Sequence, residues 1–233
     1  MEIKQLTVNG SVTLVTGEST PQAIKIKADP GEVESVTFPL VDGTMAQFDI
    51  TDRGEGRIRF DSRDCLGESC LNKGGNLDGD IENADIQKYV DDVIGRNLPS
   101  WLWEMIISTG RQTKDYEIYE TDLFIPDASE IFGEADWYET RYCRLDYYRN
   151  PHNRVKANKP CSEDACWYWS ASAGSGHSTD AVVVHTAGMS YAHNASNVIG
   201  VPVCFRIMAA DLGGLIGEAV NHGGTVRRAQ VSK

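Results

Sequence analysis

The sequence predicts a single α+β domain in which strands at both ends of the chain flank a helical middle. Through the first 60 residues, apolar and polar residues alternate, as they do in half-buried strands. From Asn83 to Gly95 the apolar residues recur instead every three to four positions, which places them on one helical face. After Trp167 the alternation returns, with Gly-rich turns between the segments. Strands grouped around inserted helices are typical of an α+β domain.

Short strands separated by turn residues are expected near the amino terminus. Val36, Phe38 and Leu40 predict one strand, and the Asp42-Gly43 dipeptide after it is a hairpin signal. Alternating residues nearer the start predict further strands: Ile3, Leu6, Val8, Val12, Leu14, Val15, Ile24 and Ile26. Residues 1–35 are therefore interpreted as a β segment for attachment or packing.

Two helices are expected in the middle of the chain. One face of the first carries Ile86, Tyr89, Val90, Val93 and Ile94. Asn83 or Asp85 can cap its start. Gly95 can end it, and Pro99 follows. The second helix is expected to start near Ser100, and its apolar residues are Leu102, Trp103, Ile106 and Ile107.

The second half of the chain is expected to consist mostly of strands. Residues 122–125 predict a short strand, after which Asp127 and Glu130 resemble a capping box and Gly133 closes one helical turn. Three further segments are β-rich, namely 167–169, 181–185 and 198–207. Residues 209–233 form a Gly-rich, weakly patterned tail, which we expect either to add a strand or to pack against a neighbouring subunit.

Composition and charge exclude two classes of partner. Of the 233 residues, 41% are hydrophobic and 24% are charged, as in ordinary globular domains. The net charge of -12 would repel a phosphate backbone, so no nucleic acid is expected as a partner. The basic residues of the tail, Arg227, Arg228 and Lys233, are interpreted as solvated. No apolar stretch is long enough to cross a bilayer, so no membrane insertion is expected.

Five stretches carry a resemblance to a known family. They are ADIQKYV (84–90), LPSWL (98–102), DLFIPDASEIFG (122–133), WYWSAS (167–172) and GVPVCFRI (200–207). In this order they resemble a large uncharacterised domain family of gut bacteria and their phages. The third and fourth stretches are the most specific. Many members of that family have Leu-Arg-Ser where this chain has Trp169-Ser-Ala-Ser.

The resemblance implies a C-type-lectin-like fold, with mixed antiparallel sheets, two main helices and short connecting loops. The family is similar to the branch of that fold that contains the formylglycine-generating enzyme and the tropism determinants that phages diversify. The implied organisation is a lectin-like domain at 36–208, preceded by the segment 1–35 and followed by the tail 209–233. In the diversified relatives, ligand contacts lie between the Trp-rich strand and the last strand, an interval that here spans 170–200.

That interval offers eight candidate ligand-binding residues. They are Ser175, His177, Thr179, His185, Tyr191, His193, Asn194 and Asn197. Flat rings and short polar groups hydrogen-bond sugars or peptides with few rotatable bonds to freeze, as in antibody paratopes. The alternative is an ordinary solvated loop surface. Trp167 and Trp169 are candidates for stacking on a sugar, although Trp residues at alternate positions place at least one in the core, for which Trp169 is favoured.

Residues 76–85 look like positions three to twelve of a calcium-binding loop. Gly74 stands where the loop requires its first acidic ligand, so a polar turn that caps the following helix is favoured instead. The Glu-Pro-Asn and Gln-Pro-Asp triplets of calcium-dependent lectins do not occur in the sequence, which argues against sugar binding through calcium. No cofactor is therefore expected.

The cysteines leave three chemistries open. They form two pairs with equal spacing, Cys65 with Cys70 and Cys161 with Cys166, and two single residues, Cys143 and Cys204. The paired spacing permits a structural zinc site. It equally permits two local disulfides in an oxidising exterior, or free thiols.

Motifs for catalysis are not found, and we expect no enzyme. The sequence lacks a Gly-x-Ser-x-Gly elbow, a phosphate-binding Gly-Lys-Ser/Thr loop and a His-Glu-x-x-His zinc helix. Residues 174–177 place a serine near His177, but adjacent loop residues rarely form a triad. The cysteine pair with which the formylglycine-generating relatives oxidise cysteine is not recognisable. His177, His185 and His193 are spaced by eight, which guarantees no common face, so no metal site is expected.

Taken together, these features predict a phage virion protein, either a tail or head-fibre tip or a capsid decoration. Its expected partners are a bacterial cell-surface glycan or protein, other virion proteins and further copies of itself. Met1 to Leu6 lack the basic and apolar regions of a signal peptide, so synthesis in the host cytoplasm and release by lysis are expected. The alternative is a bacterial surface adhesin or interaction module without enzymatic activity. An oxidoreductase of the formylglycine-generating type is disfavoured.

Overall fold

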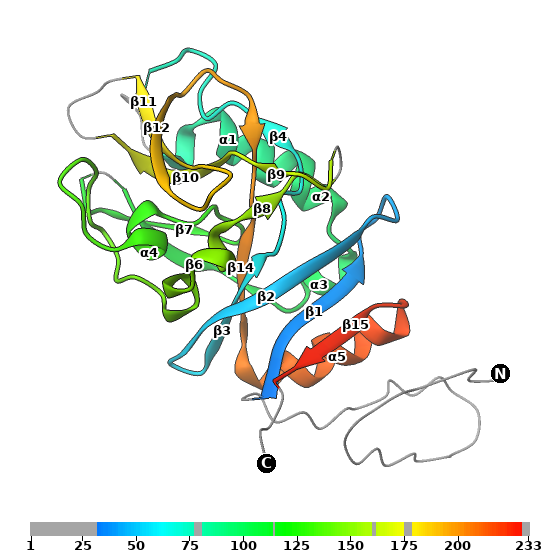
Figure 1. Ribbon diagram of the computed structural model, residues 1–233. Helices are drawn as coiled ribbons and strands as arrows, with labels where there is room; N and C mark the ends of the chain where they lie inside the picture. The colour runs from blue at the N-terminus through cyan, green and yellow to red at the C-terminus, as the bar shows by residue number, and fades with distance from the viewer. Residues whose placement is uncertain (1–31, 77–80, 114, 160–161, 175–178, 230–233) are drawn as a thin grey trace, which may run out of the picture.

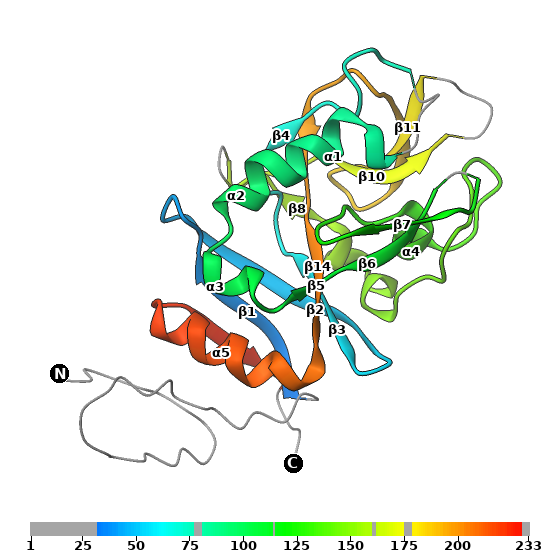
Figure 2. The same ribbon diagram turned by 180° about the vertical axis from the view of Figure 1, so that it is seen from behind.

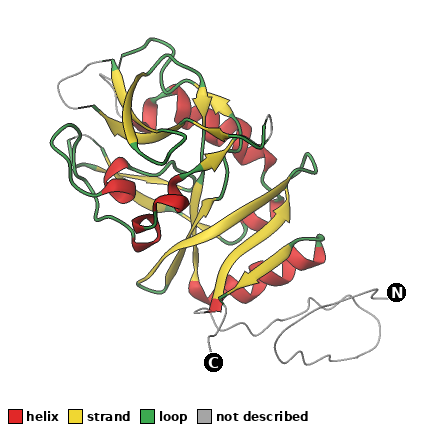
Figure 3. Cartoon of the chain, in the orientation of Figure 1, coloured by secondary structure: helices red, strands yellow, loops and turns green. Residues whose placement is uncertain are grey.

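Two main sheets organise the described part of the computed structural model, which comprises residues 32–76, 81–113, 115–159, 162–174 and 179–229. The architecture is mixed α+β, as the sequence predicts (Figure 1). Strands occur throughout the described ranges, with helices inserted between them (Figure 3). The strands predicted before residue 32 lie outside the described residues.

A six-stranded sheet has the order β15-β1-β2-β3-β14-β5, and each pair of neighbours is antiparallel. Its strands are β1 (Val33–Pro39), β2 (Met45–Gly54), β3 (Arg57–Ser62), β5 (Ile106–Ile107), β14 (Cys204–Met208) and β15 (Thr225–Arg228). The predicted hairpin at Asp42-Gly43 joins β1 to β2. Gly43 adopts a φ of 85°, and the Asp42 carboxylate accepts a hydrogen bond of 2.8 Å from the Thr44 amide.

A five-stranded sheet has the order β12-β11-β10-β13-β4, in which only β10 and β13 pair in parallel among the described strands. Its strands are β4 (Glu68–Ser69), β10 (Tyr168–Ala173), β11 (Asp180–Val184), β12 (Ser190–Asn194) and β13 (Ile199–Gly200). Two ribbons complete the strands, β6 (Thr109–Gln112) with β7 (Ile118–Thr121) and β8 (Lys156–Ala157) with β9 (Ala165–Cys166). The strand expected at 122–125 is reduced to one bridge between Phe124 and Cys204.

The first predicted helix is longer than expected. It consists of α1 (Asp85–Tyr89), a π-helical turn (Val90–Ile94) and α2 (Gly95–Asn97), which form one rod in Figure 2. Ala84 occupies the N-cap, so neither Asn83 nor Asp85 caps the helix. Gly95 does not end it either. A Cβ at Gly95 would lie 3.2 Å from the ring of Trp103, so this glycine permits close packing inside the helix.

The second predicted helix is shorter than expected. α3 (Ser100–Trp103) is a single turn, and Ile106 and Ile107 leave it to form β5. Their backbone pairs with Arg206 and Ile207 of β14, so hydrogen bonds to a distant strand override the local helical spacing. The remaining helical segments are α4 (Ala128–Phe132), α5 (Leu212–Asn221) and single 3-10 turns at Ile81–Asn83, Asp146–Arg149, Pro151–Arg154 and Ala209–Asp211.

The main core lies between the helices and one face of the six-stranded sheet. In Figure 2, α3 and α5 lie across β1 and β2. Phenylalanines of neighbouring strands form a continuous ladder under them. The ring centroids of Phe38 and Phe48 are 5.1 Å apart, and Phe205 lies 5.2 Å from both Phe48 and Phe60. All four side chains are fully buried. The apolar residues that alternate with polar ones in the sequence therefore form one apolar face of the sheet.

The carboxyl-terminal segment, expected as a tail, belongs to this core in its described part. α5 buries Leu212, Leu215 and Ile216, and β15 pairs with β1, which fulfils the expectation of an added strand. Val33 and Ser35, assigned by sequence to the amino-terminal segment, lie within β1.

Gly224, between α5 and β15, should not tolerate a side chain. A Cβ there would lie 2.0 Å from the carbonyl oxygen of Thr37. We expect Gly224→Ala to lower the free energy of unfolding by about 1–3 kcal/mol, because the backbone at Gly224 or Thr37 must move to make room for the Cβ atom. As a control, Gly214→Ala inside α5 meets only ordinary contact and should raise stability by up to about 1 kcal/mol. Denaturant unfolding measures the free energy of unfolding of both variants. Equal changes in the two variants would contradict the close packing of Gly224 against Thr37.

A buried ion network joins α4 to the sheets. Glu130 lies at the third position of α4, where it completes the predicted capping box by accepting a 2.8 Å hydrogen bond from the Asp127 amide. Its carboxylate also accepts hydrogen bonds from Arg59 of β3 (2.6 Å) and from Arg111 of β6 (2.7 and 3.0 Å). Arg59 in turn binds Asp61 at 2.7 Å. One carboxylate therefore connects a helix, the six-stranded sheet and a ribbon.

The charges in this network offset the cost of burial. Burial alone would raise the pKa of Glu130, but the positive charges of Arg111 and Arg59 outweigh it and hold that pKa far below its ordinary value. At Asp61, burial is likewise outweighed by Arg59, and the hydroxyl of Tyr148 donates a 2.6 Å hydrogen bond that lowers the pKa further. These groups are therefore ionised in the folded protein at neutral pH.

Removing the charge of Glu130 should destabilise the fold. We expect Glu130→Gln to lower the free energy of unfolding by about 3–5 kcal/mol, because two buried guanidinium groups lose their shared partner. Asp146→Asn, which removes the exposed ion pair with Arg149, is the control and should change stability little. Urea unfolding at pH 7 measures both.

The same residue predicts a pH dependence. Because the folded pKa of Glu130 lies below its ordinary value of 4.5, this stabilisation is present above pH 4.5 and is lost as the pH falls. Between about pH 5 and 3, we therefore expect the wild type to lose more stability than Glu130→Gln does. Parallel pH profiles for the two proteins would contradict this role of Glu130.

Candidate functional site

An aromatic cluster lies at the outer edge of the five-stranded sheet. Its centre is Trp167, which links β9 to β10. The centroid of its ring lies 4.4 Å from His185, 5.4 Å from Tyr191 and 5.4 Å from His193, and all three rings approach at steep interplanar angles of 65–87°. We call these four residues the Trp167 cluster. Such edge-to-face contacts are a favourable geometry for aromatic rings.

Strand register explains why the four rings meet. Val183 of β11 pairs with Trp169 on one side and with Tyr191 on the other, so these side chains share a face of the sheet. Because side chains alternate along a strand, Trp167, His185 and His193 fall on the same face. The spacing of eight could not by itself place His185 and His193 on one face, and the register of β11 and β12 does so. Gly188, with a φ of 74°, turns β11 back onto β12 and brings them together.

Exposure increases across this face towards its outer strand. Trp169 is fully buried, as predicted, and its indole nitrogen donates a 2.8 Å hydrogen bond to the Ser69 carbonyl. Trp167 is half-buried, and Tyr191 on the outermost strand β12 is 59% exposed. In Figure 1 these strands occupy the end of the molecule opposite α5 and β15. The face thus passes from core to surface at the Trp167 cluster.

The two imidazole rings are held in one tautomer. The backbone amides of Asn194 and Ala187 donate to the Nδ1 atoms of His193 (3.2 Å) and His185 (3.1 Å). A backbone amide can only donate, so Nδ1 accepts and each neutral ring carries its proton on Nε2. The side-chain amide of Asn197 adds a second hydrogen bond of 2.6 Å to Nδ1 of His193. In its neutral form, each ring therefore carries its hydrogen-bond donor at Nε2.

The structure divides the eight predicted residues by role. His185, Tyr191 and His193 come together around Trp167, and Asn197 orients His193. Asn194 shapes the next turn, because its side-chain oxygen accepts hydrogen bonds from the amide and hydroxyl of Ser196. Thr179 lies outside the cluster and contacts the Asp180 carboxylate at 3.3 Å. Ser175 and His177 lie outside the described residues.

Trp167 was not among the eight predicted ligand-binding residues and was expected only as a candidate for stacking on a sugar, although its sequence context indicated a more central position. It stands two positions from the core residue Trp169, and the segment 180–194 reads as two alternating strands around Gly188. A hairpin with that register places Tyr191 on the same face as the Trp-rich strand, with β11 between them. Other exposed apolar side chains lie close by in sequence, with Met189 and Val198 both 62% exposed.

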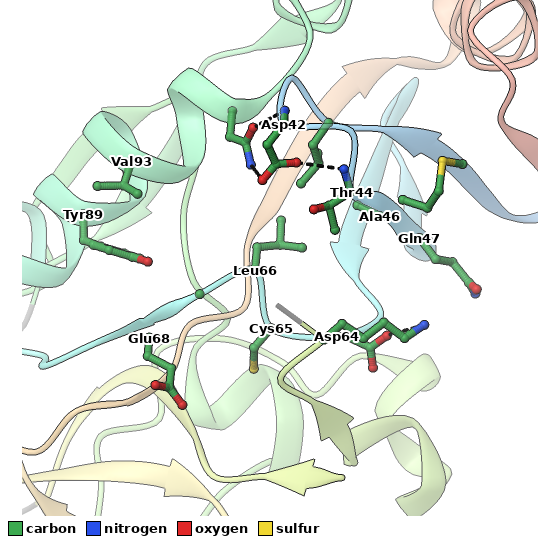
Figure 4. Close-up of a pocket in the computed structure, with 15 residues that line it drawn as sticks. Asp42, Thr44, Ala46, Gln47, Asp64, Cys65, Leu66, Glu68, Tyr89 and Val93 are labelled. Atoms are coloured by element: carbon green, nitrogen blue, oxygen red, sulfur yellow. Dashed lines mark hydrogen bonds and ion pairs between the residues drawn. The ribbon is translucent and has the colours of Figure 1, made fainter. Parts of the chain in front are cut away.

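A cavity of about 300 Å³ lies on another part of the molecule, between the start of β2 and the helix rod (Figure 4). Three carboxylates line it, and each already has a partner. Asp42 binds Thr44, Asp64 accepts from the Ala157 amide at 3.1 Å, and Glu68 accepts from the Asn158 side chain at 2.6 Å. Each of the three carboxylates is therefore held in place by a hydrogen bond within the fold.

Two further properties concern metal binding and membrane insertion. Within the described ranges, no group of three or more His, Cys, Asp or Glu side chains is placed to hold a metal ion. The calcium-like segment cannot be compared in full, because 77–80 lie outside the described residues. None of the helices in the described ranges is long and apolar enough to cross a bilayer.

Comparison with known proteins finds no matching family model, no matching curated protein and no matching solved structure.

Proposed function

We propose that this chain is a phage virion protein of C-type-lectin-like fold, which displays the Trp167 cluster to bind a bacterial surface glycan or protein. The observation that carries the proposal is the position of the cluster, where the core face of a sheet becomes exposed at its outer strand. The mixed α+β architecture with antiparallel sheets is compatible with such a fold. The virion assignment rests on the five resembling stretches, and further virion proteins and copies of the chain are its proposed partners.

The chemistry of the cluster suits a sugar ring or a short peptide segment. The exposed ring of Tyr191 offers a flat apolar surface, and the Nε2–H groups of His185 and His193 offer hydrogen-bond donors to hydroxyl or carbonyl oxygens. Trp167 packs between these rings and fixes their spacing. Binding of this kind requires no metal and no catalytic step, so the proposed role is recognition without enzymatic activity.

A bacterial surface adhesin would use the same cluster, and it is the second candidate because resembling stretches also occur in gut bacteria. The location of the protein distinguishes the two functions. Under the first proposal, antibodies raised against the chain should label purified phage particles in electron micrographs. Particles without label, together with label on uninfected bacteria, would favour the adhesin.

Truncating Tyr191 should weaken attachment without affecting folding. We expect Tyr191→Ala to reduce binding to host cells at least about tenfold, because an exposed aromatic anchor is lost. Tyr116→Ala is a matched control, since Tyr116 has the same exposure of 59% on a different part of the chain. Cell-binding titrations and thermal unfolding measure affinity and stability in parallel. Equal affinities of the two variants would place the binding surface elsewhere.

Pretreatment of the cells identifies the class of ligand. Periodate destroys sugar diols, whereas protease removes surface proteins. Loss of binding only after periodate indicates a glycan, and loss only after protease indicates a protein.

A further inference from the structure

Two cysteines that are far apart in the sequence lie side by side in the fold. The sulfur atoms of Cys65 and Cys166 are 3.6 Å apart, although 101 positions separate the residues along the chain. Cys65 follows β3, and Cys166 ends β9 directly before Trp167. Neither sulfur forms a disulfide in the structure. The sequence spacing had left local disulfides between Cys65 and Cys70 and between Cys161 and Cys166 open as one alternative, beside zinc binding and free thiols. Cys161 lies outside the described residues.

The surrounding backbone holds these two thiols together. The Cys65 amide donates a 2.8 Å hydrogen bond to the Ala157 carbonyl of β8, and β8 pairs with β9 through Lys156 and Cys166. Gly200 lies against both sulfurs. A Cβ at Gly200 would approach the Cys65 sulfur to 2.6 Å and the Cys166 sulfur to 3.1 Å. Because this position has no side chain, space remains for the sulfurs beside the backbone.

The two thiols differ in access and in acidity. Cys65 is fully buried, and burial raises its pKa well above the ordinary value. Cys166 is half-buried, and its hydrogen bond with the Cys65 thiol lowers the pKa of Cys166, although partial burial opposes that effect. A thiolate is the nucleophile in disulfide exchange. Cys166 is therefore the residue that meets and attacks an external reagent, and Cys65 is placed behind it as the resolving thiol.

We propose that Cys65 and Cys166 form a disulfide when the protein meets an oxidising medium that contains small-molecule disulfides. The Cys166 thiolate attacks one sulfur of such a disulfide, so a mixed disulfide forms and one small thiolate leaves. Cys65 gives up its proton to that thiolate and attacks the Cys166 sulfur, which expels the second small thiolate. Two protein thiols are oxidised, and one external disulfide is reduced to two thiols. The sulfurs need to close from 3.6 Å to about 2.0 Å.

The cross-link would fasten the strand that carries the recognition cluster. Trp167 follows Cys166 directly, and its carbonyl accepts a 2.9 Å hydrogen bond from the Gly200 amide. The link would run from Cys166 to Cys65, which lies in the connection between β3 and β4. A covalent loop of this length restricts the unfolded chain strongly. We therefore expect oxidation to raise Tm by roughly 10 °C, as loop entropy and the size of the chain imply.

The test uses the full chain equilibrated with glutathione disulfide or with reduced glutathione. Digestion without reduction, with trypsin and a Glu-specific protease, cleaves after Glu68 and Glu163 and so separates Cys65 from Cys70 and Cys161 from Cys166. Mass spectrometry should find the fragments of Cys65 and Cys166 joined in the oxidised sample. Thermal unfolding should show the rise in Tm in the same sample.

Two variants complete the test. Cys166→Ser should lose both the joined fragments and the rise in Tm, whereas Cys70→Ser, the control at a nearby buried thiol, should keep both. The proposal is overturned if the oxidised wild type joins Cys65 to Cys70 or Cys161 to Cys166. It is equally overturned if Cys166 carries only glutathione at equilibrium, or if Cys70→Ser abolishes the link between the Cys65 and Cys166 fragments.

Discussion

The carboxylate of Glu130 is the point on which the arrangement of the described elements depends. It accepts hydrogen bonds from Arg59 and Arg111 within 3.0 Å, and it closes the capping box of α4. Arg111 also lies over the rings of Phe124 and Tyr142, at 4.5 and 4.2 Å from their centroids. Hydrophobic packing is non-directional, whereas these bonds have fixed geometry. The network therefore gives α4, β3 and β6 one mutual orientation beyond what apolar contact specifies.

The five-stranded sheet acquires its recognition surface from this framework. Both faces of β10 and β11 are covered: Trp169 and Val183 belong to the main core, and Tyr168 and Val184 to a second cluster of buried residues. The face that packs against the main core becomes exposed at β12. The rings of the Trp167 cluster thus stand on hydrogen-bonded strands, and Asn197 and the turn amides orient the imidazoles. A rigid surface of this kind loses little conformational entropy when a ligand binds.

Part of the fold and of the candidate site could be predicted from residues that are close together in the sequence. The Asp127 and Glu130 capping box, the Asp42-Gly43 hairpin and the burial of Trp169 each depend on neighbours in sequence, and each is confirmed. Features set by distant partners were missed. Ile106 and Ile107 leave a helical pattern to pair with β14, and the contact between Cys65 and Cys166 could not be read from the spacing of the cysteines. The site was predicted as a loop region, but its grouping around Trp167 required the register of β11 and β12.

The outer position of β12 has a consequence for self-association. Among the described strands, β12 has a partner on one side only, so its other side is a sheet edge on which a second copy could add a strand. The strand is short, at five residues, and Asn194 ends it in a tight turn stabilised by Ser196. Short edges that turn away offer few consecutive groups to an incoming strand. A surface that exposes aromatic rings is thereby protected against aggregation through its own edge.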